Sequence, residues 1–244
     1  MSHTVTQRSD AAAPGRFAPL NGEQARALLA DGFLSLPDMT DADDIAFIRS
    51  LVEPILADPD LKRRAVVRAI AKDEGKEPVS EVINIVELEP RLTESRFFRR
   101  AWAITEALFG RGAQLKFDHV IAKPPYSNKE TAWHQDIAYS RRVTLSAKRL
   151  HWWLPLQPVN ADNGCMQFVA GSHKAAIQRH WPVSADGHKA TQPPQAAPTI
   201  CDLPVGGATI HLPKTLHYTG PNITGSHRLA WIIQIGVMSW PTLL

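Results

Sequence analysis

The sequence predicts a mainly β protein with flanking helices, arranged as a sandwich or jelly roll rather than as a parallel α/β sheet. Beyond residue 115, short segments rich in β-branched and aromatic residues are separated by clusters of Pro, Gly, Asn and Asp. Before that point, apolar residues recur mainly with helical periodicity. The chain has 244 residues, of which 44% are hydrophobic, so it is long enough to bury the core of one domain.

The N-terminal region is predicted to form a helix, a strand and a second helix. Asn21 can cap a helix that ends near Gly32, and residues 33–36 alternate like a short strand. Asp41 can cap the next helix. The apolar residues of that helix recur at intervals of three and four, at Ile45, Ile48, Leu51, Val52 and Ile55.

Two segments are not expected to build the core. Residues 1–16 are small and polar and cannot bury enough apolar surface to offset their ordering entropy, so we predict a disordered tail before a single domain over residues 17–244. The basic residues between positions 62 and 72 are interleaved with apolar residues at helical spacing. This pattern is typical of a solvated helix face.

The rest of the chain is predicted to contain one helix and a series of strands. Residues 82–86 are rich in β-branched side chains and predict a strand, which is followed by a helix over residues 94–109. Further strands are predicted at residues 115–122, 150–156, 166–169, 208–212 and 228–238. Residues 175–199 collect prolines and show no sustained pattern, so they predict a long loop.

Charge and cysteine usage limit the partners and the compartment. The chain has 27 Lys and Arg against 24 Asp and Glu, and the net charge of +3 is weak beside the basic stripe of a nucleic-acid-binding protein. Cys165 and Cys201 have neither disulfide-framework nor zinc spacing, so reduced, buried thiols are expected. We find no secretory leader and no apolar run of bilayer-spanning length, which favours a cytoplasmic protein with neither a nucleic-acid nor a membrane partner.

A candidate metal site begins at His134 and Asp136. These residues stand two apart, so in an extended strand both side chains leave the same face and can share one ion. A facial arrangement of two histidines and one carboxylate leaves coordination positions open on iron, but it needs a third ligand. His211 and His217 both occur near the end of a later predicted strand and compete for that role.

The segment Gly206–Asn222, followed by Arg228, resembles the second half of the signature of the phytanoyl-CoA dioxygenase family. The resemblance extends over most of the chain. It includes the opening helix and strand over Leu20–Leu36, the lysine of Lys123-Pro124-Pro125, the turn Asn163-Gly164, and Gly171-Ser172-His173-Lys174. One departure is Ala170, where the family usually has proline, and this affects a turn rather than the chemistry.

The resemblance implies a double-stranded β-helix core, which is a cupin-like jelly roll, and a specific ligand set. It implies that Fe(II) is held by His134, Asp136 and His217, because only His217 stands before a Gly-Pro-Asn turn and at the family's step before Arg228. Arg228 is then expected to bind the distal carboxylate of 2-oxoglutarate, with Lys123 as a second positive charge. A further expectation is that Trp153 lines the 2-oxoglutarate site.

The activity that the resemblance implies is that of an Fe(II)- and 2-oxoglutarate-dependent dioxygenase. Such an enzyme uses O2 to oxidise, most simply to hydroxylate, a C–H bond of a small-molecule substrate and releases succinate and CO2. Since Asp136 is present, a halogenase, which has a small residue at this position, is disfavoured. Secondary metabolism is one expected setting, and the sequence does not identify the substrate, the type of oxidation or the oligomeric state.

Two other functions stay open at this stage. One is a cupin-like metal enzyme that does not use 2-oxoglutarate, against which Arg228 and Lys123 argue. The other is a non-catalytic protein that binds a metal or a small ligand. The long loop Ala175–Thr199 is predicted to form a mobile lid over the substrate pocket, in which His180, Trp181 and Lys189 are candidate substrate contacts.

Overall fold

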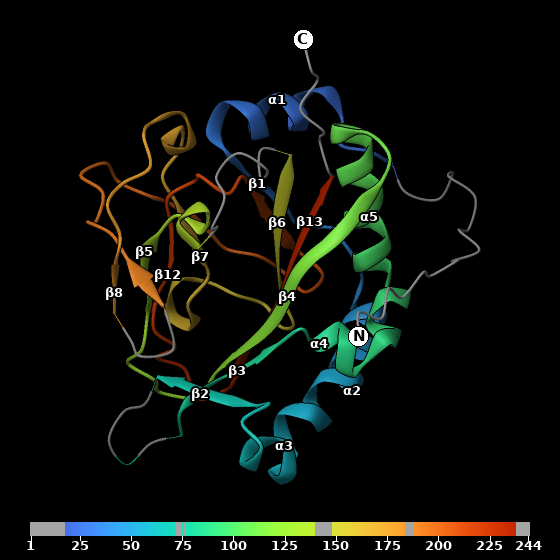
Figure 1. Ribbon diagram of the computed structural model, residues 1–244, viewed down its shortest axis with the longest axis vertical. Coiled ribbons are helices and arrows are strands. Elements are labelled where there is room, and N and C mark those ends of the chain that lie inside the picture. The colour runs from blue at the N-terminus through green and yellow to red at the C-terminus, as the bar shows by residue number, and fades with distance from the viewer. Residues whose placement is uncertain (1–17, 72–74, 76, 140–147, 184–187, 238–244) are drawn as a thin grey trace, which may run out of the picture.

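The protein consists of two facing antiparallel sheets with helices packed over the outer side of the larger one (Figure 1). The computed structural model describes residues 18–71, 75, 77–139, 148–183 and 188–237. The predicted disordered tail, residues 1–16, lies outside the described residues.

The larger sheet has seven strands, and every pairing within it is antiparallel. In spatial order the strands are β1 (Phe33–Leu36), β11 (Ala208–His211), β6 (Arg149–Pro155), β13 (Arg228–Val237), β4 (Ala113–Lys123), β3 (Val79–Ile83) and β2 (Arg68–Ala71). The long strands β4, β13 and β6 are neighbours at its centre, so residues far apart in the chain meet there in register.

The smaller sheet has four strands and covers one face of the larger sheet. Its order is β10 (Thr199–Cys201), β7 (Met166–Phe168), β12 (His217–Thr219) and β5 (Thr131–His134). A short hairpin of β8 (Trp181–Pro182) and β9 (Lys189–Ala190) lies beside β5. Apolar side chains from both sheets, among them Phe33, Phe168 and Trp153, pack in the space between them.

The helices are α1 (Gly22–Asp31), α2 (Ala42–Ala57), α3 (Pro59–Arg63), α4 (Ile85–Leu88) and α5 (Arg96–Phe109). The three longer ones begin at side-chain caps on Asn21, Asp41 and Ser95, which confirms the predicted starts of the first two helices. Within the described residues, no helix combines the length and the apolar character required to cross a bilayer.

The largest apolar core lies between the helices and the outer face of the larger sheet. Phe97 of α5 packs edge-on against Trp152 of β6 and at a tilt against Trp231 of β13, and all three side chains are buried. The buried carboxylate of Asp44 on α2 accepts hydrogen bonds from the backbone N–H groups of Arg96 and Phe97, which joins the two long helices. Helix packing therefore leaves the opposite, concave face of the sheet free to build a site.

Two predicted elements differ from the structure. The strand predicted over residues 82–86 ends at Ile83, because Asn84 adopts a left-handed conformation (φ 52°) and the next residues enter α4. The helix face predicted between positions 62 and 72 is wrong beyond Arg63. Ala65 has φ 56°, which turns the chain, and Arg68 then pairs across the sheet with Glu81.

Candidate metal centre and cosubstrate pocket

His134 is the last residue of β5, and Asp136 opens a short 3-10 turn, Asp136–Tyr139. The prediction that both residues lie in one extended strand is therefore wrong, since the strand stops before the carboxylate. Gln135 helps to hold the turn, because its side chain donates to Lys214 O (2.7 Å) and accepts from Gln178 N (2.8 Å). The two predicted ligands still converge, with His134 Nε2 3.4 Å from Asp136 Oδ1.

His217 completes this group from β12. It pairs directly with His134 across the smaller sheet, their ring centroids are 4.1 Å apart, and its Nε2 atom lies 3.7 Å from Asp136 Oδ1. The ligand atoms of the three residues lie within 4.8 Å of one another, which is the spacing that a single ion can bridge.

Backbone carbonyls prepare both histidines to coordinate through Nε2. His134 Nδ1 donates to Ala132 O (2.7 Å), and His217 Nδ1 donates to Thr215 O (2.9 Å). A neutral imidazole that is protonated on Nδ1 presents a lone pair on Nε2. Burial, together with the neighbouring His134, holds the pKa of His217 well below its usual value, which keeps the ring neutral.

The second oxygen of Asp136 faces away from these two histidines. Oδ2 accepts hydrogen bonds from His151 Nδ1 and, at 3.0 Å, from His211 Nε2. Burial alone would raise the pKa of Asp136, but the surrounding imidazoles, with His217 and His151 foremost, hold it well below its usual range. The carboxylate is therefore ionised and is oriented from both sides.

His211, the competing candidate, belongs to a second group with Asp136 and His151 that is also compact enough for an ion. Two observations favour the group with His134 and His217. Both nitrogens that face Oδ2 are donors, because an ionised carboxylate only accepts. In addition, His151 is fully buried and does not line the cavity, so an ion held there would lack open positions.

Arg228 lies on β13 in the same cavity as the three ligands. Its side chain is buried, its Nε atom has no hydrogen-bond partner, and no carboxylate among the described residues forms an ion pair with it. Burial lowers its pKa to about 10, which still leaves it charged. Trp153 lies beneath the guanidinium, 5.7 Å from its ring centroid. A buried cation that faces an open cavity in this way fits an incoming carboxylate.

Lys123 lies next to Arg228 across the β4–β13 pairing but does not line the cavity. It is 1% exposed, and its Nζ atom donates to Gly220 O (2.6 Å) and to Thr219 Oγ1 (3.0 Å). Burial and the charge of Arg228 lower its pKa well below the usual value. Thr219, which does line the cavity, was missed by sequence reasoning, although it follows His217 by two residues on the same strand.

The cavity has a volume of about 490 Å³ and also reaches strand β3, which lies next to β4 in the larger sheet. There, Glu81 of β3 pairs with Arg68 and lies 2.6 Å from His119 Nδ1. Burial would raise the pKa of Glu81, but His119 and then Arg68 lower it to about 2. Sequence reasoning missed this group, although period-two alternation along β4 places Phe117, His119 and Ile121 on one face.

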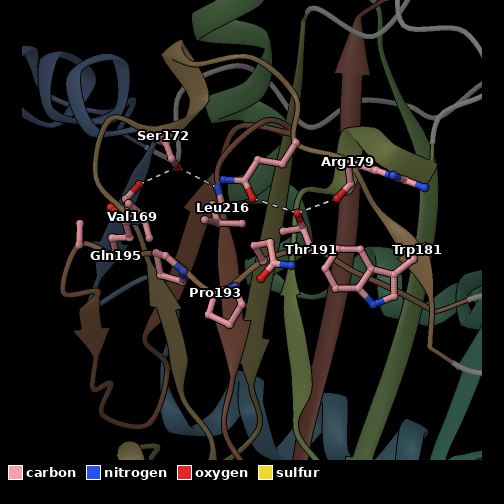
Figure 2. A pocket seen from close by; sticks show the side chains of 12 residues that line it. Val169, Ser172, Arg179, Trp181, Thr191, Pro193, Gln195 and Leu216 are labelled. Atoms are coloured by element: carbon pink, nitrogen blue, oxygen red, sulfur yellow. Dashed lines mark hydrogen bonds between the residues drawn. The ribbon is translucent and has the colours of Figure 1, made fainter.

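Residues 175–183 and 188–199 of the predicted lid, Ala175–Thr199, are described in the structure. They contain the short strands β8 and β9, so the segment is more regular than the loop predicted from the sequence. Thr191 N donates to Trp133 O, and the Thr191 hydroxyl lies 2.9 Å from Gln178 Oε1 and 2.8 Å from the carbonyl oxygen of Arg179. Figure 2 shows this hydroxyl beside Arg179. These contacts attach the segment to β5 next to His134.

The three lid residues predicted to contact substrate do not line the metal cavity. Trp181 lies on a separate outer groove with Pro193 (Figure 2), His180 accepts from Gln135 N, and Lys189 donates to Ala138 O. His188 lines the metal cavity instead. The predicted lid segment therefore reaches the cavity through His188, which was not among the residues predicted from the sequence.

Two curated proteins are similar to this chain in sequence. Ectoine dioxygenase of Sphingopyxis alaskensis is 24% identical over 169 residues, which are 66% of this chain and 52% of that protein. A probable alpha-ketoglutarate-dependent hypophosphite dioxygenase of Stutzerimonas stutzeri is 29% identical over 143 residues, 55% of this chain and 49% of that protein. The chain spans about half the length of the curated relatives that it matches.

Solved structures confirm the jelly-roll fold. EvdO2 from Micromonospora carbonacea var. aurantiaca, complexed with 2-oxoglutarate, superposes with a TM-score of 0.74 at 22% identity, over 93% of this chain and 95% of that chain. The carbocyclase SnoK from nogalamycin biosynthesis gives a TM-score of 0.73 at 20% identity, over 91% and 87%. The family model described as phytanoyl-CoA dioxygenase (PhyH) matches residues 28–230, and the chain belongs to this family.

Proposed function

We propose that the protein is a non-haem Fe(II) dioxygenase that uses 2-oxoglutarate and O2 to oxidise, most simply to hydroxylate, a C–H bond of a small molecule. One observation supports this proposal more strongly than the others. Arg228 is a buried guanidinium without a carboxylate partner among the described residues, and it shares one cavity with His134, Asp136 and His217. A metal site and an anion site in one cavity match a cosubstrate that chelates a metal at one end and carries a carboxylate at the other.

The donor set fits iron. Two imidazole nitrogens and one carboxylate oxygen converge on the cavity side, and the protein adds no fourth ligand to this group from the described residues. When bound, Fe(II) would supply the chemistry that couples O2 and the decarboxylation of 2-oxoglutarate, with release of succinate and CO2, to oxidation of the substrate.

The chain's own residues prepare the site for this use. Arg228 binds the distal carboxylate, and Trp153 limits how far the guanidinium can move. The Thr219 hydroxyl accepts a hydrogen bond from Lys123, so its own proton is free to point to the cosubstrate. Lys123 thereby acts through Thr219 as a positioning residue, a different role from the direct contact that the sequence implied.

The names of the similar proteins support the proposal. Ectoine dioxygenase and alpha-ketoglutarate-dependent hypophosphite dioxygenase are named as dioxygenases, and EvdO2 is described in complex with 2-oxoglutarate. SnoK, from nogalamycin biosynthesis, supports secondary metabolism as a setting. We also propose that the protein works in the cytoplasm, because Cys165 and Cys201 are free and buried.

The test separates cosubstrate use from the two alternatives. Protein loaded anaerobically with Fe(II) is titrated with 2-oxoglutarate in a calorimeter and is then exposed to O2 with candidate substrates, while succinate and a product heavier by one oxygen atom are followed by mass spectrometry. We expect saturable 2-oxoglutarate binding and substrate-dependent succinate. Metal binding without 2-oxoglutarate binding would support the cupin-like enzyme. Binding of both with no succinate formed from any compound would support the non-catalytic protein.

A further inference from the structure

Arg68, Glu81 and His119 form a polar cluster on the cavity wall, to which the proposed function gives no role. All three residues line the cavity. The carboxylate of Glu81 bonds Arg68 through Oε2 and His119 through Oε1, and its side chain is almost completely buried. A buried charge is costly unless it is paired, and paired polar groups with shifted pKa values in a cleft often serve binding or catalysis. The cluster is therefore a candidate for contact with a ligand.

Strand pairing places His119 on the same face of the larger sheet as Trp153. His119 of β4 pairs with Ile232 of β13, and Ile232 pairs on its other side with Trp153 of β6. All three line the cavity. Neighbouring strands are roughly 5 Å apart, so two strand spacings, roughly 10 Å, separate His119 from Trp153, which lies beneath Arg228. A group bound at His119 therefore leaves the cosubstrate site at Arg228 free.

Glu81 fixes which nitrogen of His119 carries a proton. Burial would raise the pKa of Glu81, but His119 and then Arg68 lower it to about 2, so the carboxylate is ionised and can only accept hydrogen bonds. His119 Nδ1, 2.6 Å from Glu81 Oε1, is therefore the donor. Because Arg68 already balances the charge of Glu81, the imidazole can be neutral, and a neutral ring with a proton on Nδ1 has a lone pair on Nε2.

The Nε2 atom of His119 is accessible from the cavity. Among the described residues, no hydrogen bond or ion pair ends at this atom. The side chain is 16% exposed, and Nε2 is not sealed from solvent. Since His119 lines the cavity, the lone pair on Nε2 can accept a hydrogen bond from a bound molecule.

Apolar side chains surround the imidazole on the cavity wall. Phe117 and Ile121 stand two residues before and after His119 on β4, and the rings of Phe117 and His119 have centroids 5.0 Å apart. Ile232 is the partner of His119 on β13, and all three apolar residues line the cavity. Pockets for small molecules combine apolar walls with a few polar groups that fix orientation. This part of the cavity therefore suits a mainly apolar molecule with one hydrogen-bond donor.

We propose that the substrate is a mainly apolar small molecule with a hydroxyl group, and that this hydroxyl donates a hydrogen bond to His119 Nε2. This inference rests on the proposed function, because it treats the rest of the cavity as the metal and cosubstrate sites. β13 separates β4 from β6, and His151 of β6 bonds the metal ligand Asp136. A molecule held at His119 extends over β13 toward the metal centre, so the oxidised C–H bond is remote from the hydroxyl.

Paired variants separate the two nitrogens of His119. The amide of asparagine reaches about as far as Nδ1, so His119→Asn can keep the bond to Glu81 but has no polar group at the position of Nε2. The amide of glutamine reaches about as far as Nε2, so His119→Gln can keep a polar group for the ligand but loses the bond to Glu81. His227→Gln is the control, because His227 also pairs with a glutamate, Glu77, but is exposed and does not line the cavity.

The probes are pairs of compounds that share one skeleton. Benzyl alcohol is compared with benzyl methyl ether, and cyclohexanol with methoxycyclohexane, because an ether accepts hydrogen bonds but cannot donate them. Protein loaded with Zn(II), so that nothing turns over, and with excess 2-oxoglutarate, so that Arg228 is occupied, is titrated with each probe by ligand-observed NMR. Zn(II) affinity, 2-oxoglutarate affinity and thermal unfolding are measured on every variant.

We expect the wild type and His227→Gln to bind at least one alcohol about tenfold more tightly than its ether, His119→Asn to lose this preference, and His119→Gln to retain part of it. A preference that survives in His119→Asn would show that the side chain serves only to hold Glu81 and would overturn the proposal. Equal signals for alcohols and ethers in the wild type, whether strong or absent, would overturn it too. Failure of the proposed function is distinguishable, because 2-oxoglutarate would then not bind the wild type.

Discussion

His211 and Asp136 contact each other on the side of the carboxylate that faces away from His134 and His217, with His211 Nε2 3.0 Å from Asp136 Oδ2. The imidazole donates this bond, so its proton occupies the nitrogen that a metal would need. His151 donates to the same oxygen. The two buried histidines hold Oδ2, whereas Oδ1 faces His134 and His217, so we assign His211 and His151 a positioning role in the proposed metal site.

The three ligands should be individually essential. His134→Ala, Asp136→Ala and His217→Ala are each expected to abolish Fe(II) binding at micromolar concentration and turnover, because an ion with two remaining protein ligands is held far less tightly. Circular dichroism should show the fold retained, since the apolar core on the helix side does not depend on the ion. Metal titration monitored by calorimetry measures the loss. Retention of wild-type iron affinity by any of the three variants would disprove the ligand assignment.

Removing the support behind Asp136 should weaken the site without destroying it. His211→Asn is expected to lower Fe(II) affinity about 10–100-fold, because the carboxylate loses a donor that orients it. His217→Ala, measured alongside, should lose binding altogether. The reverse order of effects would show that His211 is the ligand and His217 the support.

Replacing Arg228 should change the affinity for 2-oxoglutarate but not the affinity for iron. Arg228→Ala is expected to weaken 2-oxoglutarate binding by about 2–5 kcal/mol, since one partner of a buried charge pair is removed. Iron binding should be unchanged. Arg99→Ala serves as a charge-matched control on α5, and calorimetric titration of Fe(II) and then 2-oxoglutarate gives both constants. An unaltered 2-oxoglutarate affinity in Arg228→Ala would refute the cosubstrate assignment.

Glu81 should make the free energy of unfolding depend on pH in the acid range. Its pKa is lowered in the folded protein from 4.5 to about 2, so the ionised form stabilises the fold by about 3 kcal/mol above pH 4.5. This contribution is lost as the pH falls from 4.5 toward 2, because the carboxylate then takes up a proton. Urea unfolding of the wild type and Glu81→Gln should differ at pH 6, and the difference should shrink as the pH is lowered below 4.5. A difference that is constant with pH would mean that the charge is not the stabilising element.

The hydroxyl of Thr191 should hold the lid segment against β5. Thr191→Val removes the hydrogen bonds to Gln178 and Arg179 with little change in side-chain size, so backbone amides of residues 175–183 should exchange about tenfold faster by mass spectrometry. Thr199→Val, at an exposed position on β10, provides the matched control. Identical exchange in both variants would show that the segment is held by other contacts and would count against a lid that opens at this end.

Local patterns determined much of the architecture without any knowledge of the tertiary fold. Caps at Asn21 and Asp41 and apolar periodicity depend only on residues a few positions apart, and the predicted starts of α1 and α2 are confirmed. The strands β4, β6 and β13 are likewise close to their predicted bounds, because β-branched runs between turn residues are local signals as well.

Only the tertiary structure decided what each polar residue near the centre does. Asp136 leaves the strand because Gln135 is tied to Lys214, a contact between segments 79 residues apart. Lys123 turns out to support Thr219, and His211 to support Asp136. Neither role has a local pattern, because each depends on which strands are neighbours.

The same reason explains why the positions of two basic residues in the cavity could not be predicted from the sequence. Arg149 and Lys116 are 33 positions apart in the sequence, yet both line the same cavity, which depends on strand order and on one extra residue in β4. A register shift of one residue would turn either side chain to the other face. The sequence by itself therefore determined the fold class and the residues of a candidate metal centre, whereas the charged lining of the cavity was decided by how distant strands pair, an interaction that no short segment of the chain encodes.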